Sequence, residues 1–230
     1  MSDEQIAASA GHIAGGEWVA PGLRTGGSMA ALDATMRPID ALHGAGLGLL
    51  AGYVQPFQAA VDRMAGDASA IRSVADTWQQ VSAQVQQIQQ SLTHAVATET
   101  TQWQGAAADG YRARAGEISS ALNRIATLAT AVQSATTTMG QALAEGRQQA
   151  GTHVAALVQQ LISGAGPAIA VEGGVTPAVL AQAAATISSS APLIAMIEQQ
   201  VRQTIGNVQS HLATLADAMN NTPTTVAIAS

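Results

Sequence analysis

Apolar residues recur at alternating steps of three and four positions from about residue 68 to residue 161. This is the heptad pattern of helices that pack along one seam. A break at residues 102–105 divides the pattern into two helices. Since neither helix can bury its apolar stripe alone, the two are predicted to form one long antiparallel hairpin. The first stripe comprises Ile71, Val74, Trp78, Val81, Val85, Ile88, Leu92 and Ala95, and the second comprises Tyr111, Ala115, Ile118, Leu122, Ile125, Ala129, Val132, Met139, Leu143, Ala150, Val154, Leu157 and Leu161.

A hairpin that turns at residues 103–105 predicts which residues meet across the seam. Near the turn, Val96 or Leu92 is expected opposite Tyr111 or Ala115, and farther away Trp78 is expected opposite residues 125–139. Between residues 78 and 91, glutamines fill most of the intervening positions of the first helix and are expected to face outward: Gln79, Gln80, Gln84, Gln86, Gln87, Gln89 and Gln90.

The sequence flanking the hairpin is less regular and predicts four parts. Residues 1–27 are rich in glycine, show no sustained period and are expected to form a flexible arm. Residues 28–164 are expected to form the hairpin domain together with short helices that precede it. Residues 165–222 are expected to form a C-terminal helical pair that packs on the hairpin, and residues 223–230 a tail.

Two breaks define the predicted C-terminal pair. The Gly- and Pro-rich residues 164–174 are typical of a linker. Ser190 followed by Pro192 is a start signal for the last helix. The apolar stripe of that helix is expected to fold back on the hairpin: Ile194, Ile197, Val201, Ile205, Val208, Leu212 and Leu215. On its outer face, Glu198 and Arg202 are expected to pair.

The composition supports helices throughout. Hydrophobic residues make up 47% of the chain and aromatic residues only 3%. Alanine is the commonest hydrophobic residue and favours helix, and the β-branched and aromatic clusters typical of strands are missing. The predicted fold class is therefore an all-α helical bundle: a long antiparallel hairpin, short N-terminal helices and a C-terminal helical pair.

Charge and cysteine content exclude several function classes. The nine cations are all arginines and face fifteen acids, for a formal net charge of −6. Such a chain cannot neutralise a nucleic-acid backbone, so nucleic-acid binding is not expected. The absence of cysteine excludes disulfides, thiol nucleophiles and cysteine-ligated metals. The acidic N-terminal residues do not resemble a secretory signal, so the general secretory route is not expected.

Catalytic and metal-binding patterns are not found in the sequence. None of the five histidines is followed by a His, Asp or Glu three or four residues later, and no phosphate-binding glycine loop follows a strand. Asp109 and Glu117 are expected to pair with Arg112 and Arg114 rather than to act as an acid and a base. The protein is therefore predicted to be no enzyme, with no cofactor and no metal.

One small group of residues is a candidate functional site. Trp103 and Gly105 lie at the predicted turn, where glycine can adopt a left-handed conformation and tryptophan can close the end of the bundle. The alternatives are a purely structural turn, with Trp103 as an end plug, and a recognition site.

This group resembles the Trp-x-Gly (WxG) superfamily of actinobacterial type VII secretion. The resemblance covers about residues 36–219. The residues that carry it occur in this order: Gly66, Asp67, Ile71, Trp78, Trp103, Gly105 and Tyr111. Residues 46–56 look like the helical N-terminal region of large proteins associated with this system. In those proteins the region often precedes a toxin module.

The resemblance implies a non-enzymatic secretion substrate or targeting module that acts through helix–helix association. It implies that Trp103, Gly105 and Tyr111 contribute to the secretion signal or to partner binding. The partner would be another helical protein, a second copy or the secretion machinery. The location would be cytoplasmic before export and extracellular or at the cell surface afterwards. The family's acid four residues after a Tyr is missing, since Ala115 follows Tyr111 and Phe57 follows Tyr53. A stand-alone relative, an N-terminal fragment and a signal supplied by a partner remain alternatives.

A second function class also fits the sequence. Residues 178–197 are uncharged and about long enough to span a bilayer, and residues 44–52 are rich in glycine. The alternative is therefore a membrane-acting protein that forms a pore or inserts into lipid.

Overall fold

A computed structural model describes residues 3–172 and 174–220 and confirms the all-α fold class. Across these residues the chain is 84% helical and has no strands. The α-helices are α1 (Asp3–Ala14), α2 (Ala30–Asp33), α3 (Ile39–Gly44), α4 (Ala51–Arg63), α5 (Ala68–Glu99), α6 (Ala106–Glu172) and α7 (Pro177–Asn220), and two short 3₁₀ helices are η1 (Pro21–Leu23) and η2 (Gly48–Leu50).

The chain divides into two compact units, and α6 and α7 contribute to both. The described part of the first unit comprises residues 3–18, 69–138 and 206–220. The second unit comprises residues 19–68 and the described residues of 139–205.

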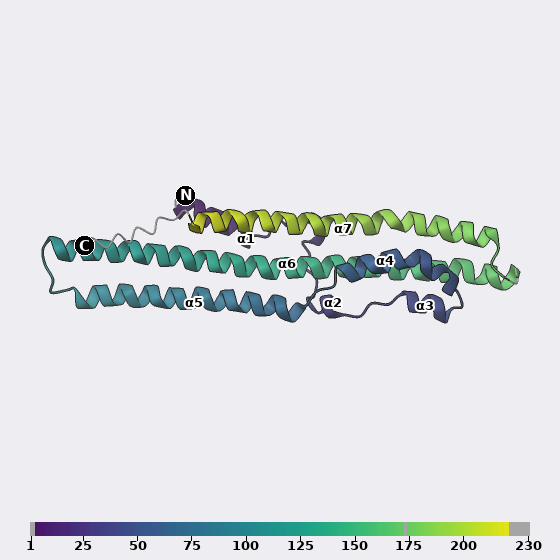
Figure 1. Cartoon of the computed structure of the whole chain (residues 1–230), viewed down its shortest axis with the longest axis horizontal. Helices are drawn as coiled ribbons and strands as arrows, with labels where there is room; N and C mark the ends of the chain where they lie inside the picture. The colour runs from purple at the N-terminus through teal and green to yellow at the C-terminus, as the bar shows by residue number, and fades with distance from the viewer. Residues whose placement is uncertain (1–2, 173, 221–230) are drawn as a thin grey trace. The chain divides into compact units, whose positions relative to one another are not determined.

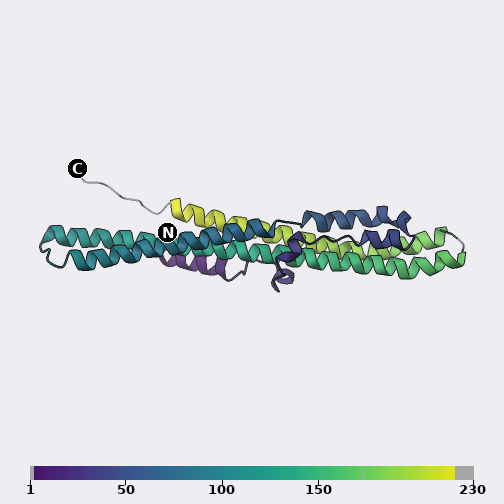
Figure 2. The same ribbon diagram turned by 90° about the horizontal axis from the view of Figure 1, so that it is seen from below.

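Helices α5 and α6 form the predicted antiparallel hairpin in the first unit, where they run side by side (Figure 1 and Figure 2). Hydrogen bonds fix their register. The Ser82 hydroxyl donates to the Ala126 carbonyl over 3.1 Å, and the Gln89 amide donates to the Ser119 hydroxyl over 2.7 Å. Extending this register places Trp78 level with the segment expected for it, residues 125–139.

The seam of α5 lies one residue away from the predicted stripe over much of its length. Val74 and Ile88 are exposed, whereas Ala75 and Ser82 are buried and Gln89 is half-buried. The predicted positions of Val74, Ile88 and Gln89 are therefore wrong. Small side chains at the seam allow the two helices to approach closely, and the larger neighbouring side chains then lie at the edge of the interface.

The expected flexible arm over residues 1–27 instead contains α1. Ile6, Ala10 and Ile13 share one helix face and are all buried. Trp18 is also buried, and its indole N–H donates to the Ile13 carbonyl over 3.0 Å. The apolar contacts of this face stabilise the segment in spite of its glycines.

In the second unit, neither of the two helix breaks predicted near the C-terminus is found at its predicted place. Helix α6 continues through Gly164 and Pro167 to Glu172, so the linker over residues 164–174 is wrong for most of its length. Helix α7 continues through Pro192, so the C-terminal pair is a single helix. Packing between these helices outweighs the local breakers, because Leu161, Ala165, Ile194 and Ile197 are buried.

Close approach of α6 and α7 depends on Gly146. A Cβ atom at this position would lie 2.6 Å from a methyl carbon of Val201, too near for the present spacing. The predicted stripe of the last helix is largely confirmed, since Ile194, Ile197 and Val201 are buried in this unit. The predicted Glu198–Arg202 pair is also present, and Glu198 makes a closer bond to Arg63 on α4, over 2.8 Å.

Candidate functional site

The turn between α5 and α6 is fixed by Arg112, a role that the sequence analysis missed. From the first turns of α6, the Arg112 guanidinium donates to the carbonyls of Thr100 and Trp103 over 2.6 and 2.8 Å. It also forms the expected ion pair with Asp109, over 3.0 Å. The carbonyls at the end of α5 and in the turn thus find a charged donor, which stabilises one conformation of the turn.

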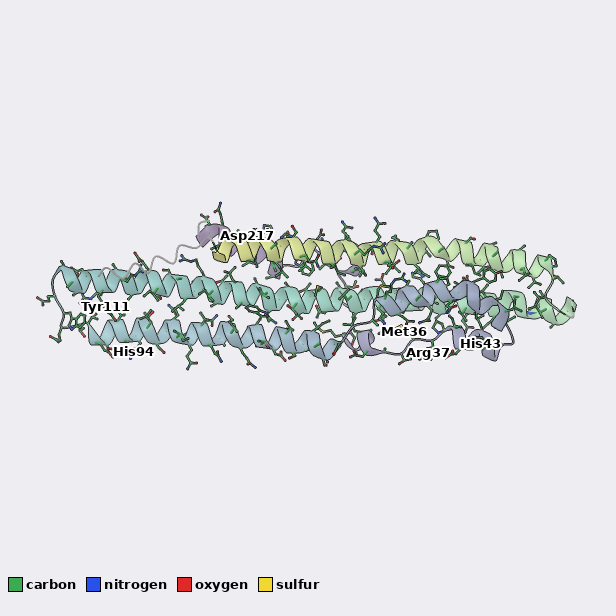
Figure 3. All side chains as sticks on the ribbon, viewed as in Figure 1. Met36, Arg37, His43, His94, Tyr111 and Asp217 are labelled. Atoms are coloured by element: carbon green, nitrogen blue, oxygen red, sulfur yellow. The ribbon has the colours of Figure 1, made fainter. Side chains whose placement is uncertain are left out.

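Trp103 and Tyr111 form an exposed aromatic pair beside this turn. Their ring centroids lie 5.6 Å apart and the ring planes are tilted by 58°. Trp103 is 54% exposed and Tyr111 is 47% exposed. Tyr111 lies on α6 beside the turn, across from the part of α5 that carries His94 (Figure 3). Trp103 is therefore not the buried end plug of the structural alternative.

Gly105 makes the turn possible through its backbone conformation. Its φ angle is +93°, and a Cβ atom built there meets no other atom within 4 Å. The constraint is therefore on the backbone angle and not on the space available for a side chain.

Gly105→Ala is expected to lower the free energy of unfolding by about 1–2 kcal/mol, because an L-residue adopts a left-handed backbone at roughly that cost. Urea unfolding followed by circular dichroism measures the change. Gly110→Ala is the matched control: Gly110 lies inside α6 with open space around it, so alanine should raise stability by about 0.5–1 kcal/mol. Equal effects of the two substitutions would contradict the assigned role of Gly105.

An apolar surface extends from the aromatic pair along the hairpin. We call it the hairpin stripe, and it consists of Val74, Val81 and Ile88 on α5 and Tyr111, Ile118 and Ile125 on α6. All of these except Val81 are at least 40% exposed.

The hairpin stripe follows from the heptad register. Each of its residues directly precedes a position that faces the other helix, such as Ser82 on α5 or Ser119 and Ala126 on α6. In an antiparallel pair, the positions that precede the seam lie on the same side of both helices. The two rows therefore form one continuous apolar surface. All six residues belong to the predicted seam but lie beside the actual one.

Other chemistry in the molecule is sparse. Across the described residues, no group of three His, Asp or Glu side chains could hold a metal ion. The second unit contains a cavity of about 690 Å³ between residues 32–65 and Arg147, near the labelled Met36, Arg37 and His43 (Figure 3). The carboxylate of Asp33 in its lining already accepts a bond from the Ala68 amide.

No protein-family model, curated protein or solved structure matches this chain.

Proposed function

We propose that the protein is a non-enzymatic substrate or targeting module of a type VII secretion system and acts by associating with a helical partner. The observation that supports this most is the exposed pair of Trp103 and Tyr111 at a rigid Trp-x-Gly turn, continued by the hairpin stripe. Aromatic and aliphatic side chains exposed in one row are typical of a protein interface.

The geometry of the hairpin stripe fits a helical partner. Its residues repeat every seven positions on two adjacent helices, which is about 10.5 Å along each axis. A helix laid along the stripe presents apolar side chains at the same repeat. Covering the five exposed residues would contribute on the order of 5 kcal/mol before the entropy of association is subtracted.

The missing acid of the family's signal has a physical reason in this hairpin. Position 115, four residues after Tyr111, is buried against α5 and is occupied by Ala115. A carboxylate there would lose its hydration without a partner for its charge. This supports an arrangement in which the helical partner supplies the acidic half of the signal.

The direct experiment measures export. The protein should be detected by mass spectrometry in the culture filtrate of its source when the type VII secretion ATPase is active. It should remain in the cell lysate when that ATPase is deleted. Export that is independent of the ATPase would contradict the proposal.

Charges placed on the hairpin stripe test the association step. Ile118→Glu with Ile125→Glu should reduce export at least tenfold and leave the helical content unchanged, because both side chains are exposed. The matched control is Gln86→Glu with Gln90→Glu, which places the same charges on exposed positions of α5 outside the stripe. Equal export of the two double variants would rule out the stripe as the binding surface.

A further inference from the structure

The ends of α6 and α7 form a nearly uncharged helical hairpin in the second unit. We call it the neutral hairpin and define its arms as residues 154–171 of α6 and 177–197 of α7. Between residues 154 and 197 the only charged residue is Glu172, which lies between the arms. The arms pack directly, since a Cβ atom on Gly164 would lie 3.5 Å from the Gln182 side chain.

The arms have the length of a bilayer's hydrocarbon layer. At 1.5 Å per residue they extend for about 27 and about 31 Å, and the hydrocarbon layer is about 30 Å thick. Charges resume on α7 directly after its arm, where Glu198 forms an ion pair with Arg202, and on α6 before its arm at Arg147. Each arm is therefore bounded by charged residues of its own helix.

The burial of these arms is unlike that of core helices in a soluble protein. Only 28% of the most apolar stretch of α6 and 17% of that of α7 is buried. Large apolar side chains near the connection between the arms are exposed, and Val171 reaches 87%. By length and composition both helices qualify as candidate membrane spans.

Three of the hydroxyl side chains in the arms bond to their own helix. The hydroxyls of Ser163, Thr186 and Ser190 donate to backbone carbonyls three or four residues earlier, over 3.1 to 3.3 Å. Such bonds satisfy hydroxyl groups where no water is present. The arms contain no aromatic residue and no arginine, the side chains that most often anchor protein interfaces.

We propose that the neutral hairpin inserts into the hydrocarbon of a lipid bilayer. This goes beyond the proposed secretion role and rests on different residues from the hairpin stripe. Residues 30–63 also belong to the second unit and carry Asp40 and Asp62, so they must leave the arms on insertion.

Single cysteines test the insertion, since the native chain has none. Ala185→Cys and Gln160→Cys are exposed positions near the middle of each arm, and Gln90→Cys on α5 is the control. Each variant carries an environment-sensitive fluorophore and is mixed with phosphatidylcholine vesicles. Fluorescence at positions 160 and 185 should shift to the blue and be quenched by bromines placed deep in the acyl chains. Fluorescence at position 90 should remain unchanged.

A charge in one arm gives a second, independent readout. Ala185→Arg should weaken partition into the same vesicles at least tenfold without changing the fold, because position 185 is exposed. Gln199→Arg places the same charge on α7 just beyond the arm and should partition like the unmodified protein. Unchanged fluorescence at positions 160 and 185, or equal partition of the two arginine variants, overturns the proposal. A response confined to a label at Val175→Cys also overturns it, since only the connection would then enter the surface.

Discussion

Trp103→Ala is expected to leave the protein folded and to reduce its export at least tenfold. More than half of the Trp103 surface is already exposed, so truncation should lower the free energy of unfolding by less than about 1 kcal/mol. The turn itself is fixed by Arg112, which bonds to the main-chain carbonyl of Trp103 and not to its indole ring. Thermal unfolding by circular dichroism and mass spectrometry of the culture filtrate measure the two effects.

Trp18→Ala provides the control for Trp103→Ala. Trp18 is buried and its indole N–H is bonded to Ile13, so its truncation should cost about 3–5 kcal/mol. The two variants should therefore separate stability from recognition. If Trp103→Ala unfolds as readily as Trp18→Ala, the turn has a structural role alone.

Arg147→Met is expected to lower the free energy of unfolding by about 3 kcal/mol. The substitution removes a buried cation that forms hydrogen bonds to main-chain carbonyls of the segment before α3. The Arg147 guanidinium is buried and donates to the carbonyls of Ala31, Leu32 and Ala34. Methionine retains most of the apolar stem but leaves these carbonyls without a donor. Urea unfolding measures the loss, and hydrogen exchange should show that α2 loses protection first.

Arg202→Met is the matched control for Arg147→Met. Arg202 is exposed and its contact with Glu198 is an i,i+4 ion pair at 3.5 Å, so the substitution should cost no more than about 0.5 kcal/mol. A loss of the same size in both variants would show that the three carbonyl bonds of Arg147 contribute nothing specific.

The helical hairpin could be predicted from the sequence because its signals are local. The heptad pattern, the break at residues 102–105 and the alanine-rich composition each follow from the conformational preferences of neighbouring residues. The same holds for the ion pairs of Arg112 with Asp109 and of Arg114 with Glu117, which join residues three positions apart. The place of Trp103 and Gly105 at the turn follows from the same local signals, whereas Tyr111 belongs to the candidate site through the family resemblance alone.

Local sequence signals do not predict which residues of the hairpin are exposed. Two overlapping stripes on α5, one through Val74 and Ile88 and one through Ala75 and Ser82, fit the heptad period almost equally well. Which stripe faces α6 depends on how closely the two backbones approach, and small residues on both helices favour the second stripe. A shift of one position therefore changed Ile88 from a core residue into part of the hairpin stripe.

What the sequence determined by itself is the helical fold class, the hairpin and the position of its turn, since these depend on periodicity and on turn residues within a short stretch of chain. Only the tertiary structure decided that α6 continues past Pro167, that α7 continues past Pro192 and that α1 forms at all. In each case burial against segments distant in the sequence outweighs a local preference of about 1–3 kcal/mol for a break. The role of Arg147 belongs to the same group, because its three carbonyl partners lie more than a hundred residues away.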